Sequence, residues 1–340
     1  MNKVILNNNV EIPNIAFGVG RINEPLAETS AYSAIKSGFR LIDSSRGYGN
    51  QKEVGQAVQR AISEGIVSRA DLILTQKLGG TELGYDNILK IFEDGCKNYG
   101  TDYLDIMLIY FPLDYTPYWK RYVIDSWRAM EKLYKEGKVK VIGVSNFKVE
   151  QLVWLLNYAE IRPMINQIEL HPFYQQRLVT GFCKQNNIQV EAWSPLIYVL
   201  NNDLLKELGK KYNKSLAQIA LRWSVQNGYI PICSSKIERE IEENLDIFNF
   251  EISAEDMERI NSLDGGMHSI DNQVRPPISP DKVVDECVSR MFYRGINYTR
   301  VYKLFNLIPI LKEKRYHWDK TKWFLFGFIP LLKITTKDQH

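Results

Sequence analysis

An aspartate, a tyrosine and a lysine stand at the ends of two short apolar segments of this 340-residue chain. Asp43 ends one apolar run and Tyr48 follows it, whereas Lys77 comes directly after the run Leu72–Gln76. A phenol with its ordinary pKa of about 10 is a poor proton donor near neutral pH. A neighbouring ammonium stabilises the phenolate and lowers that pKa, and a carboxylate holds the ammonium in place. These residue types therefore predict a relay in which Tyr48 protonates a carbonyl oxygen as hydride arrives at its carbon.

The same residues also fit roles without such a relay. In a structural alternative, Asp43 caps the segment that follows it and Lys77 is a solvated residue of a loop. An isomerase or aldolase that forms a Schiff base on Lys77 is disfavoured, because pairing with Asp43 would keep the lysine protonated. Arg46 lies between two of the candidate residues, and either an anionic substrate such as a sugar phosphate or simple solvation explains it.

Eight short runs rich in branched apolar residues recur along the chain, and segments of helical periodicity separate them. Runs without polar alternation are typical of strands buried on both faces. Alternation of such strands with helices predicts parallel strands with right-handed crossovers, and eight units in about 250 residues predict a closed α/β (β/α)8 TIM barrel. The runs are Asn14–Phe17, Arg40–Asp43, Leu72–Gln76, Ile106–Ile109, Val139–Val144, Met164–Gln167, Gln189–Ala192 and Tyr229–Ile232, and the helical segments include Asn50–Ser63, Asp86–Tyr99, Val123–Glu136 and Leu216–Gln226.

The barrel has one architectural alternative, an open doubly wound sheet. No GxGxxG motif follows the first run, which disfavours a Rossmann fold. In a barrel, the side chains that follow the strands meet at one rim. Asp43, Tyr48 and Lys77 are therefore expected to converge at that rim.

Composition and charge indicate a cytoplasmic protein with an unusual C-terminal end. The four cysteines are widely spaced and form no CxxC pair, which disfavours a disulfide framework or a metal site. The N-terminus lacks the apolar core of a signal peptide, and no run of about 18 apolar residues exists. Residues 290–340 hold eleven Lys/Arg and three Asp/Glu, a net charge of +8, so the total of +3 leaves −5 on the rest. The chain before residue 290 has no basic stripe, which disfavours nucleic acid as a partner.

Longer motifs follow one another in a fixed order: LIDSSRGYGNQKEVG, DYLDIMLIYFP, KVKVIGVSNF, INQIELHPF, AWSPL and LAQIALRW. Together they closely resemble the aldo-keto reductases, in particular the prokaryotic diketogulonate and glyoxal reductases, from Val4 to Leu263. The resemblance implies a (β/α)8 barrel that binds NADP(H), or less often NAD(H), without a Rossmann domain and reduces small aldehydes and ketones. It also implies that Asp43, Tyr48 and Lys77 match three of the four catalytic residues, with Tyr48 as the general acid.

The resemblance extends to residues that contact the cofactor. Trp193 stands where a tyrosine stacks on the nicotinamide ring, and an indole stacks at least as well; plain core packing is the alternative. Hydroxyl and amide side chains suit the carboxamide because they both donate and accept hydrogen bonds. The matching residues are Ser145, Asn146 and Gln167 at the carboxamide, Trp193 at the ring, Ser194 and Leu196 at the pyrophosphate, and Glu243 and Asn244 at the adenine.

The fourth catalytic position departs from the family pattern. Tyr110, in Tyr110-Phe111-Pro112, replaces a histidine that directs the substrate carbonyl through a hydrogen bond. None of the four histidines is an obvious substitute, and His171 is expected to be structural. Because the loss of one well-placed donor costs on the order of 10²–10³ in rate, we expect altered substrate choice or slow turnover. A non-catalytic nicotinamide-binding module is the rival hypothesis.

A second departure lies at the expected 2′-phosphate site. Ser234 replaces a lysine of the family pattern, Ser235 follows it, and Glu240 replaces an arginine. A phosphate needs cations, whereas a carboxylate repels it but accepts hydrogen bonds from ribose hydroxyls. The sequence therefore predicts a weakened preference for NADP and possible use of NAD, although Lys236 could restore some binding of the phosphate.

The barrel is expected to occupy residues 1–280, and residues 281–340 to form an extension that begins with a helix over Asp281–Phe292. The segment Lys303–Lys312 recurs 21 residues later as Phe324–Lys333. Each copy surrounds a proline with aromatic and aliphatic residues, has basic residues nearby, and is too short to span a bilayer.

This repeat fits two different roles. Aromatic residues beside Lys and Arg suit an anionic membrane surface. The tail also resembles the LFGxPLLK-type ends of some bacterial enzymes of surface-polysaccharide assembly, which implies a membrane-peripheral enzyme that supplies a sugar or polyol precursor. The alternative is a hairpin that packs on the barrel or on another subunit.

Overall fold

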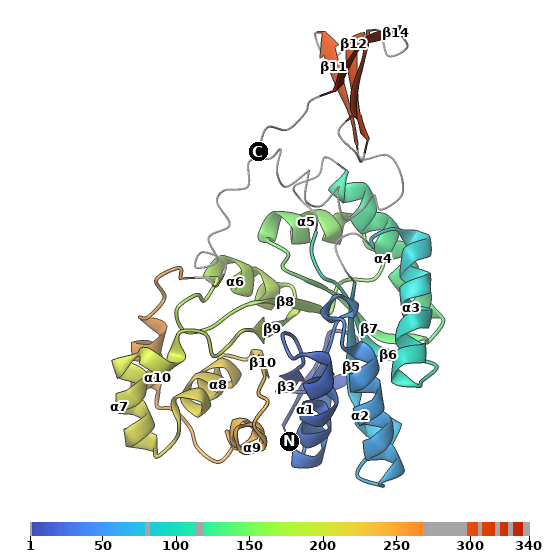
Figure 1. Ribbon diagram of the computed structural model, residues 1–340. Helices are drawn as coiled ribbons and strands as arrows, with labels where there is room; N and C mark the ends of the chain where they lie inside the picture. The colour runs from blue at the N-terminus through green and yellow to red at the C-terminus, as the bar shows by residue number, and fades with distance from the viewer. Residues whose placement is uncertain are drawn as a thin grey trace. The chain divides into compact units, whose positions relative to one another are not determined.

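Eight parallel strands form a closed barrel within the first of two compact units, Met1–Val274 and Arg275–His340 (Figure 1). The computed structural model describes residues 2–78, 82–112, 118–267 and 269, together with four strands between residues 298 and 335. Around the barrel the strands follow chain order, and the last pairs with the first. They are β3 (Ala16–Gly18), β4 (Leu41–Asp43), β5 (Ile73–Leu78), β6 (Leu104–Ile109), β7 (Val139–Ser145), β8 (Ile165–Glu169), β9 (Gln189–Trp193) and β10 (Ile230–Cys233).

All eight runs predicted as strands are confirmed, with ends shifted by a few residues. Their lack of polar alternation has the expected cause, because the side chains inside the barrel and those beneath the helices are both shielded from water. Strand β6, for example, is buried along its whole length. The closed barrel thereby excludes the open doubly wound sheet.

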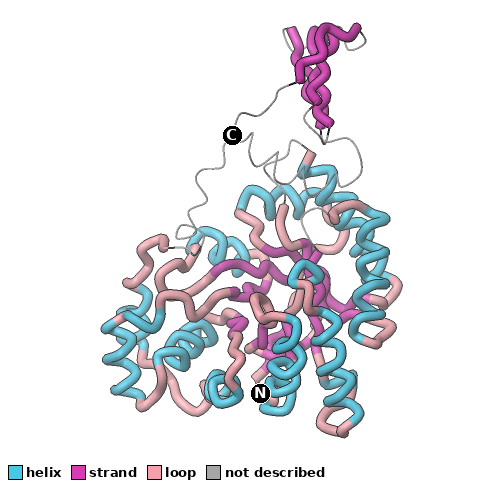
Figure 2. The backbone as a smooth tube through the Cα atoms, viewed as in Figure 1, coloured by secondary structure: helices cyan, strands magenta, loops and turns pink. Residues whose placement is uncertain are grey.

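Helices surround the strands on the outside of the barrel (Figure 2). The four helical segments predicted from the sequence are confirmed. Helix α8 begins after Ser215, whose hydroxyl accepts a hydrogen bond from the Gln218 amide while the Gln218 side chain accepts one from the Ser215 amide. The helices are α1 (Glu24–Ser37), α2 (Gln51–Ser63), α3 (Tyr85–Tyr99), α4 (Trp119–Lys135), α5 (Val149–Tyr158), α6 (Arg177–Gln185), α7 (Asp203–Tyr212), α8 (Leu216–Gln226), α9 (Glu238–Leu245) and α10 (Ala254–Asn261).

A short antiparallel hairpin precedes the barrel and was not predicted from the sequence. Its strands, β1 (Lys3–Ile5) and β2 (Glu11–Pro13), are joined by a turn that contains Asn7. The Asn7 amide donates hydrogen bonds of 3.1 Å to the carbonyls of Pro163 and Asn187, which lie just before β8 and β9. The hairpin therefore contacts the N-terminal end of the barrel and leaves the C-terminal end for chemistry.

The second unit contains one antiparallel sheet, in the order β11 (Tyr298–Leu304), β12 (Ile308–Tyr316), β13 (Lys320–Leu325) and β14 (Ile329–Thr335). Each copy of the 21-residue repeat spans the connection of one hairpin. The two hairpins share a register, because Lys303 pairs with Pro309 in the first and Phe324 pairs with Pro330 in the second. Each hairpin also has a register shift directly before Lys303 or Phe324, which are equivalent positions of the repeat.

Two predictions about the tail lie outside the described residues: the helix over Asp281–Phe292 and the boundary at residue 280. Within the part of the chain that the structure describes, no helix combines the length and the apolar character needed to cross a membrane.

Candidate active site

A buried ion pair lies at the C-terminal rim of the barrel, where the sequence predicted chemistry. Asp43 is the last residue of β4, and Lys77 lies near the end of β5. The Lys77 ammonium is 2.6 Å from Asp43 Oδ1, and the two side chains are 1% and 5% exposed. Removing one partner of such a pair typically costs about 3–5 kcal/mol, because it leaves an uncompensated buried charge. Because Lys77 is buried in contact with Asp43, the hypothesis that it is a solvated loop residue is excluded.

Two tyrosines lie close to this pair. Tyr48 belongs to the short 3-10 helix Arg46–Tyr48 after β4, and Tyr110 directly follows β6. The Lys77 ammonium lies 4.9 Å from the centroid of the Tyr48 ring and 5.6 Å from that of Tyr110. The two rings meet edge to face with centroids 6.3 Å apart, and their hydroxyls are hydrogen-bonded. A Cβ at Gly20 would lie 3.2 Å from the Tyr48 ring, so glycine leaves the ring its room.

The predicted lowering of the Tyr48 pKa is wrong for this structure. Burial raises the pKa of Tyr48 well above its ordinary value, and the Asp43 carboxylate raises it further. The hydrogen bond with Tyr110 and the charge of Arg21 oppose this rise without reversing it. Burial likewise raises the pKa of Tyr110, although the Lys77 ammonium opposes it. Both residues are therefore neutral phenols at neutral pH, the form that can donate a proton.

Ser145, Asn146 and Trp193 form a connected polar group beside the tyrosines. Asn146, with a left-handed backbone at φ 61°, donates a hydrogen bond of 2.9 Å to the Tyr110 carbonyl. The Trp193 indole N–H donates to Asn146 Oδ1 at 2.9 Å, which fixes the plane of a ring that is partly exposed rather than packed in the core. The Ser145 hydroxyl donates to the Gln167 carbonyl at 2.8 Å. A fixed flat ring next to hydroxyl and amide groups fits a nicotinamide and its carboxamide.

Gln167 belongs to the catalytic cluster more closely than the sequence suggested. Its Oε1 accepts a hydrogen bond of 3.0 Å from Lys77, and its Nε2 donates to Asp43 Oδ2 at 2.9 Å and to Glu191 Oε2 at 2.8 Å. Both amide hydrogens are thus used, so Gln167 can only accept a hydrogen bond from a carboxamide. Sequence reasoning missed Glu191, although a carboxylate inside a run expected to be buried is itself a signal.

The residues expected at the 2′-phosphate lie between β10 and α9. The Ser235 hydroxyl donates a hydrogen bond of 2.6 Å to Glu240 Oε2, in the first turn of α9. A helix N-terminus normally suits a phosphate, but here it bears acidic residues. Ser234 and Lys236 are exposed nearby in the chain.

The remaining cofactor contacts expected from the sequence also lie in segments that follow strands. Ser194 and Leu196 come directly after β9 and are partly exposed, and Ser194 has a left-handed backbone. On α9, Glu243 is partly exposed and Asn244 is buried. The expected contacts thus lie within or after the neighbouring strands β7, β8, β9 and β10, on one side of the barrel.

Arg46 is held by two carboxylates, Glu82 at 3.1 Å and Asp94 at 2.7 Å. This arrangement leaves it neither free for an anionic substrate nor simply solvated. His171 is fully buried, with Nε2 3.4 Å from Glu169 Oε1, as expected for a structural histidine. Among the described residues, no group of three or more His, Cys, Asp or Glu side chains is arranged to hold a metal ion.

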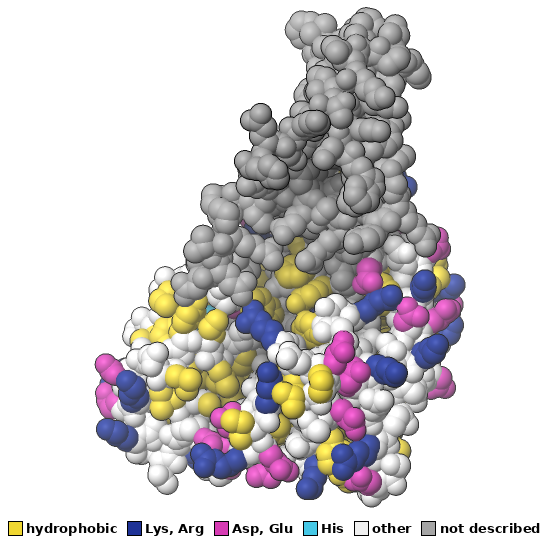
Figure 3. Space-filling view, viewed as in Figure 1, with side chains coloured by type: hydrophobic (Ala, Val, Ile, Leu, Met, Phe, Trp, Pro, Cys, Tyr) yellow, Lys and Arg dark blue, Asp and Glu magenta, His cyan; other side chains and the backbone are white. Residues whose placement is uncertain are grey.

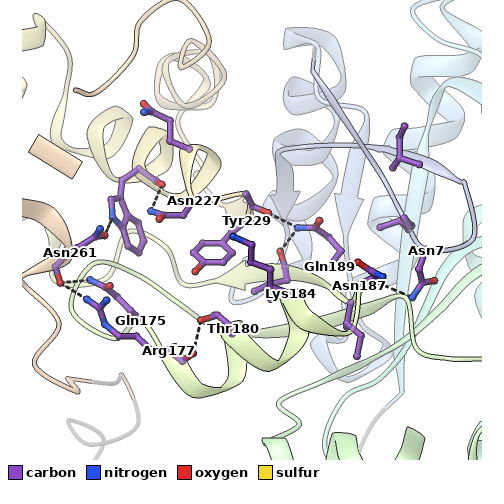
Figure 4. A pocket seen from close by; sticks show the side chains of 18 residues that line it. Asn7, Gln175, Arg177, Thr180, Lys184, Asn187, Gln189, Asn227, Tyr229 and Asn261 are labelled. Atoms are coloured by element: carbon purple, nitrogen blue, oxygen red, sulfur yellow. Dashed lines mark hydrogen bonds between the residues drawn. The ribbon is translucent and has the colours of Figure 1, made fainter. Parts of the chain in front are cut away.

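A groove of about 880 Å³ lies beside α6 and α8 and is separate from the catalytic cluster (Figure 4). It is lined by α6 and α8 and by residues at the starts of β9 and β10. Gln175 and Arg177 there donate hydrogen bonds to the Asn261 carbonyl at 3.0 and 2.9 Å. Active sites of β/α barrels form at the C-terminal ends of the strands, and the lining of this groove contains no residue of the Asp43–Lys77 cluster. On the face drawn in Figure 3, the described basic and acidic side chains are mixed and form no continuous basic stripe.

Comparisons with known proteins agree with this geometry. The family model described as "Aldo/keto reductase family" matches residues 14–198 and 197–265. The chain is 42% identical over 284 residues to the glyoxal reductase of Bacillus subtilis, covering 83% of this chain and 97% of that protein. It is 32% identical to the NADPH-dependent D-xylose reductase of Meyerozyma guilliermondii, covering 77% and 94% of the two chains.

Solved structures give the same result. A Brucella melitensis aldo/keto reductase is 40% identical, with a TM-score of 0.73, and the match covers 77% of this chain and 99% of that one. A Bombyx mori aldo-keto reductase in complex with NADP is 30% identical, with a TM-score of 0.74, and the match covers 81% and 97%. The chain therefore belongs to the aldo/keto reductase family, whose members are NAD(P)H-dependent oxidoreductases that act on carbonyl groups.

Proposed function

We propose that this chain reduces a small aldehyde or ketone to the corresponding alcohol, with NADPH or NADH as the reductant. The proposal rests on the buried Asp43–Lys77 pair. The Lys77 ammonium lies 4.9 Å from the centroid of the Tyr48 ring. This arrangement presents a neutral phenol next to a fixed cation at the rim of the barrel. The Asn146–Trp193 pair lies beside it, linked through the Tyr110 carbonyl.

The residues divide the chemistry among them. A bound nicotinamide cofactor would supply the hydride to the carbonyl carbon. Tyr48 donates its hydroxyl proton to the carbonyl oxygen as negative charge develops there, so that the C=O group becomes CH–OH. The Lys77 ammonium offsets the negative charge left on the Tyr48 oxygen, and Asp43 holds Lys77 in place. Tyr110, hydrogen-bonded to Tyr48, shapes the substrate pocket and adds a second hydroxyl near the reacting oxygen.

A non-catalytic nicotinamide-binding module is the second candidate, and the replacement of the family histidine by Tyr110 favours it. The contact of Asp43, Lys77 and Tyr48 favours the reductase, because cofactor binding alone does not need a proton donor beside a fixed cation. A Schiff base on Lys77 is disfavoured, since an ammonium held 2.6 Å from a carboxylate lacks the lone pair that attacks a carbonyl.

The first test follows the loss of NADH and NADPH absorbance with a panel of small aldehydes, ketoses and sugar phosphates. Wild type is compared with Tyr48→Phe and with Tyr158→Phe, a change to an exposed tyrosine on α5. We expect Tyr48→Phe to lower kcat by about 10²–10⁴ with little change in cofactor affinity, and Tyr158→Phe to behave as wild type. Tight cofactor binding by wild type without turnover of any carbonyl would instead support the non-catalytic module.

We also propose that the C-terminal sheet attaches the enzyme to an anionic membrane surface and that its substrate is a sugar or polyol precursor of surface polysaccharide. Paired residues form rows across an antiparallel sheet. One row joins Thr299, Lys314, Lys322 and Lys333. Lys312 and Lys320 lie two residues from members of this row, so the sheet has five lysines in or near one row, and a sheet of this charge complements anionic lipid headgroups.

The membrane proposal is tested with the full chain and vesicles of phosphatidylglycerol or phosphatidylcholine. We expect sedimentation with the anionic vesicles alone, weakened by salt and by the double change Lys322→Gln with Lys333→Gln, two residues of this row. The matched control, Arg300→Gln with Arg315→Gln, removes the same number of charges at positions outside the row and should retain most of the binding. Equal losses in both variants would show that net charge, rather than this row, attracts the protein.

A further inference from the structure

Glu191 is a buried acidic residue inside the barrel that the proposed reaction does not use. It is the middle residue of β9, is 1% exposed, and pairs in register with Gln167 on β8. Its Oε2 accepts the 2.8 Å hydrogen bond from Gln167 Nε2. Its Oε1 is buried and has no hydrogen-bond partner among the described residues. A buried carboxylate oxygen without a partner is costly, so it needs an explanation in terms of function.

Glu191 and Asp43 together fix the orientation of the Gln167 amide. The amide nitrogen donates to both carboxylates, and the amide oxygen accepts from Lys77. In the flipped orientation, the nitrogen would face the Lys77 ammonium and the oxygen would face two carboxylates. Every contact would then join two donors or two acceptors. The direction of the Gln167 amide therefore depends on the charges around it.

The cluster places two carboxylates against one ammonium. Asp43 faces Glu191 from β4 and Lys77 faces it from β5, whereas the neighbours on β8 and β10, Gln167 and Ile230, are uncharged. Burial raises the pKa of Glu191 to about 7, the Asp43 charge raises it as well, and the Gln167 hydrogen bond and Lys77 oppose the rise. The net charge of the cluster thus changes by one near neutral pH.

We propose that Glu191 is a positioning residue that locks Gln167 and, when ionised, adds a negative charge beside the nicotinamide site that favours the oxidised cofactor over the reduced one. The inference rests on the proposed function, in which Gln167 contacts the carboxamide. Loss of a hydride leaves a positive charge on the nicotinamide ring. A negative charge in a poorly solvated interior stabilises that ring more than it would in water.

The test compares the dissociation constants of oxidised and reduced cofactor between pH 6 and pH 8.5, measured by calorimetry on the full chain. We divide the dissociation constant of the oxidised cofactor by that of the reduced cofactor. In wild type, we expect this ratio to fall about tenfold as Glu191 ionises. In Glu191→Gln, which keeps an acceptor for Gln167 but has no charge, the ratio should stay near its value at low pH. Glu191→Asp restores the charge and should restore the pH dependence.

The control is Glu169→Gln, which removes a buried carboxylate that binds His171 and the Ser269 amide instead of Gln167. In Glu169→Gln, the ratio of the two dissociation constants should depend on pH as it does in wild type. The same slope in wild type and Glu191→Gln, or a flat ratio in wild type, would overturn the role of Glu191 while leaving the reductase intact. Failure to bind either cofactor would overturn the proposed function and this inference together.

A measurement without cofactor separates these outcomes. The raised pKa means that the folded protein binds one more proton than the unfolded chain between about pH 4.5 and about 7. Wild type should therefore lose stability relative to Glu191→Gln as the pH rises through this window, as followed by urea unfolding. A constant difference between the two proteins would show that Glu191 does not titrate there and would contradict the proposal.

Discussion

Tyr110 stands where the resemblance to the aldo-keto reductases implies a histidine. Its ring lies against Phe111, with centroids 4.4 Å apart, and its hydroxyl contacts Tyr48. The variant Tyr110→Phe keeps the ring and removes the hydroxyl, so we expect kcat/KM for a small aldehyde to fall by about 10²-fold if that donor acts on the reacting oxygen.

Tyr110→His is the companion variant, because it restores the donor of the family pattern. Steady-state kinetics should show that it retains activity and prefers different substrates, since imidazole is smaller than a phenol. Unchanged kinetics in Tyr110→Phe would limit Tyr110 to shaping the pocket.

At the residue scale, the sequence predicted which side chains meet but not how deeply they lie. Asp43, Tyr48 and Lys77 follow neighbouring strands, so a barrel brings them to one rim. The pKa of Tyr48 was predicted in the wrong direction because burial, which dominates it, depends on tertiary packing. The double use of the Gln167 amide and the place of Glu191 also depend on which side chains pair across strands inside the barrel.

At the scale of elements, the packing of α2 on α3 depends on a single glycine. A Cβ at Gly55 would lie 1.8 Å from the Asn98 carbonyl oxygen. We expect Gly55→Ala to reduce the free energy of unfolding by about 3 kcal/mol, because the two helices must move apart. The measurement is urea unfolding followed by circular dichroism.

The control for this change is Gly181→Ala in α6, where an added Cβ meets nothing within 4 Å. Alanine there should stabilise the protein by about 0.5–1 kcal/mol through helix propensity alone. Similar destabilisation by both alanines would rule out the close approach of α2 and α3 as the cause.

The sequence predicts that Ser234 and Glu240, at the start of α9, weaken the preference for NADP. The double change Ser234→Lys with Glu240→Arg introduces two cations and removes the carboxylate bound by Ser235. We expect the ratio of kcat/KM for NADPH to that for NADH to rise at least about tenfold, since charge-assisted contacts to a phosphate are strong. Glu242→Arg, at an exposed position of the same helix, is the control for net charge. A wild type that already strongly prefers NADPH would contradict the role given to Glu240.

The elements that the sequence predicted are those with long apolar patterns. The eight barrel strands were found because burial on both faces gives continuous apolar runs, and α8 was found because its apolar residues recur with helical spacing. The strands β1 and β2 are as short as the predicted strands β3 and β4, but β1 is exposed at both ends and β2 begins with an exposed residue, so neither forms a continuous buried run. For the second unit the sequence offered a hairpin only as one alternative and did not predict the sheet, because the prolines of the repeat disfavour a helix without specifying a strand.

At the scale of the whole molecule, function and charge are distributed unevenly: the catalytic cluster lies at one end of the barrel, and the positive charge lies in the C-terminal part of the sequence. The N-terminal hairpin contacts one end of the barrel through Asn7, while the catalytic cluster and the expected cofactor contacts lie at the other. Residues 290–340 have a net charge of +8, and the rest of the chain has a net charge of −5. Attachment to an anionic surface through the second unit would therefore leave chemistry and attachment to separate parts of the chain.

The 21-residue period has a consequence for how such a tail can evolve. Each period adds two strands, and in an antiparallel sheet an even number of strands returns the chain to the same direction. Duplication of one unit would therefore lengthen the sheet without changing the direction in which the chain leaves it. Each basic residue near an anionic bilayer contributes about 1 kcal/mol, so gain or loss of a whole unit would adjust residence time at a membrane in steps, without altering the barrel.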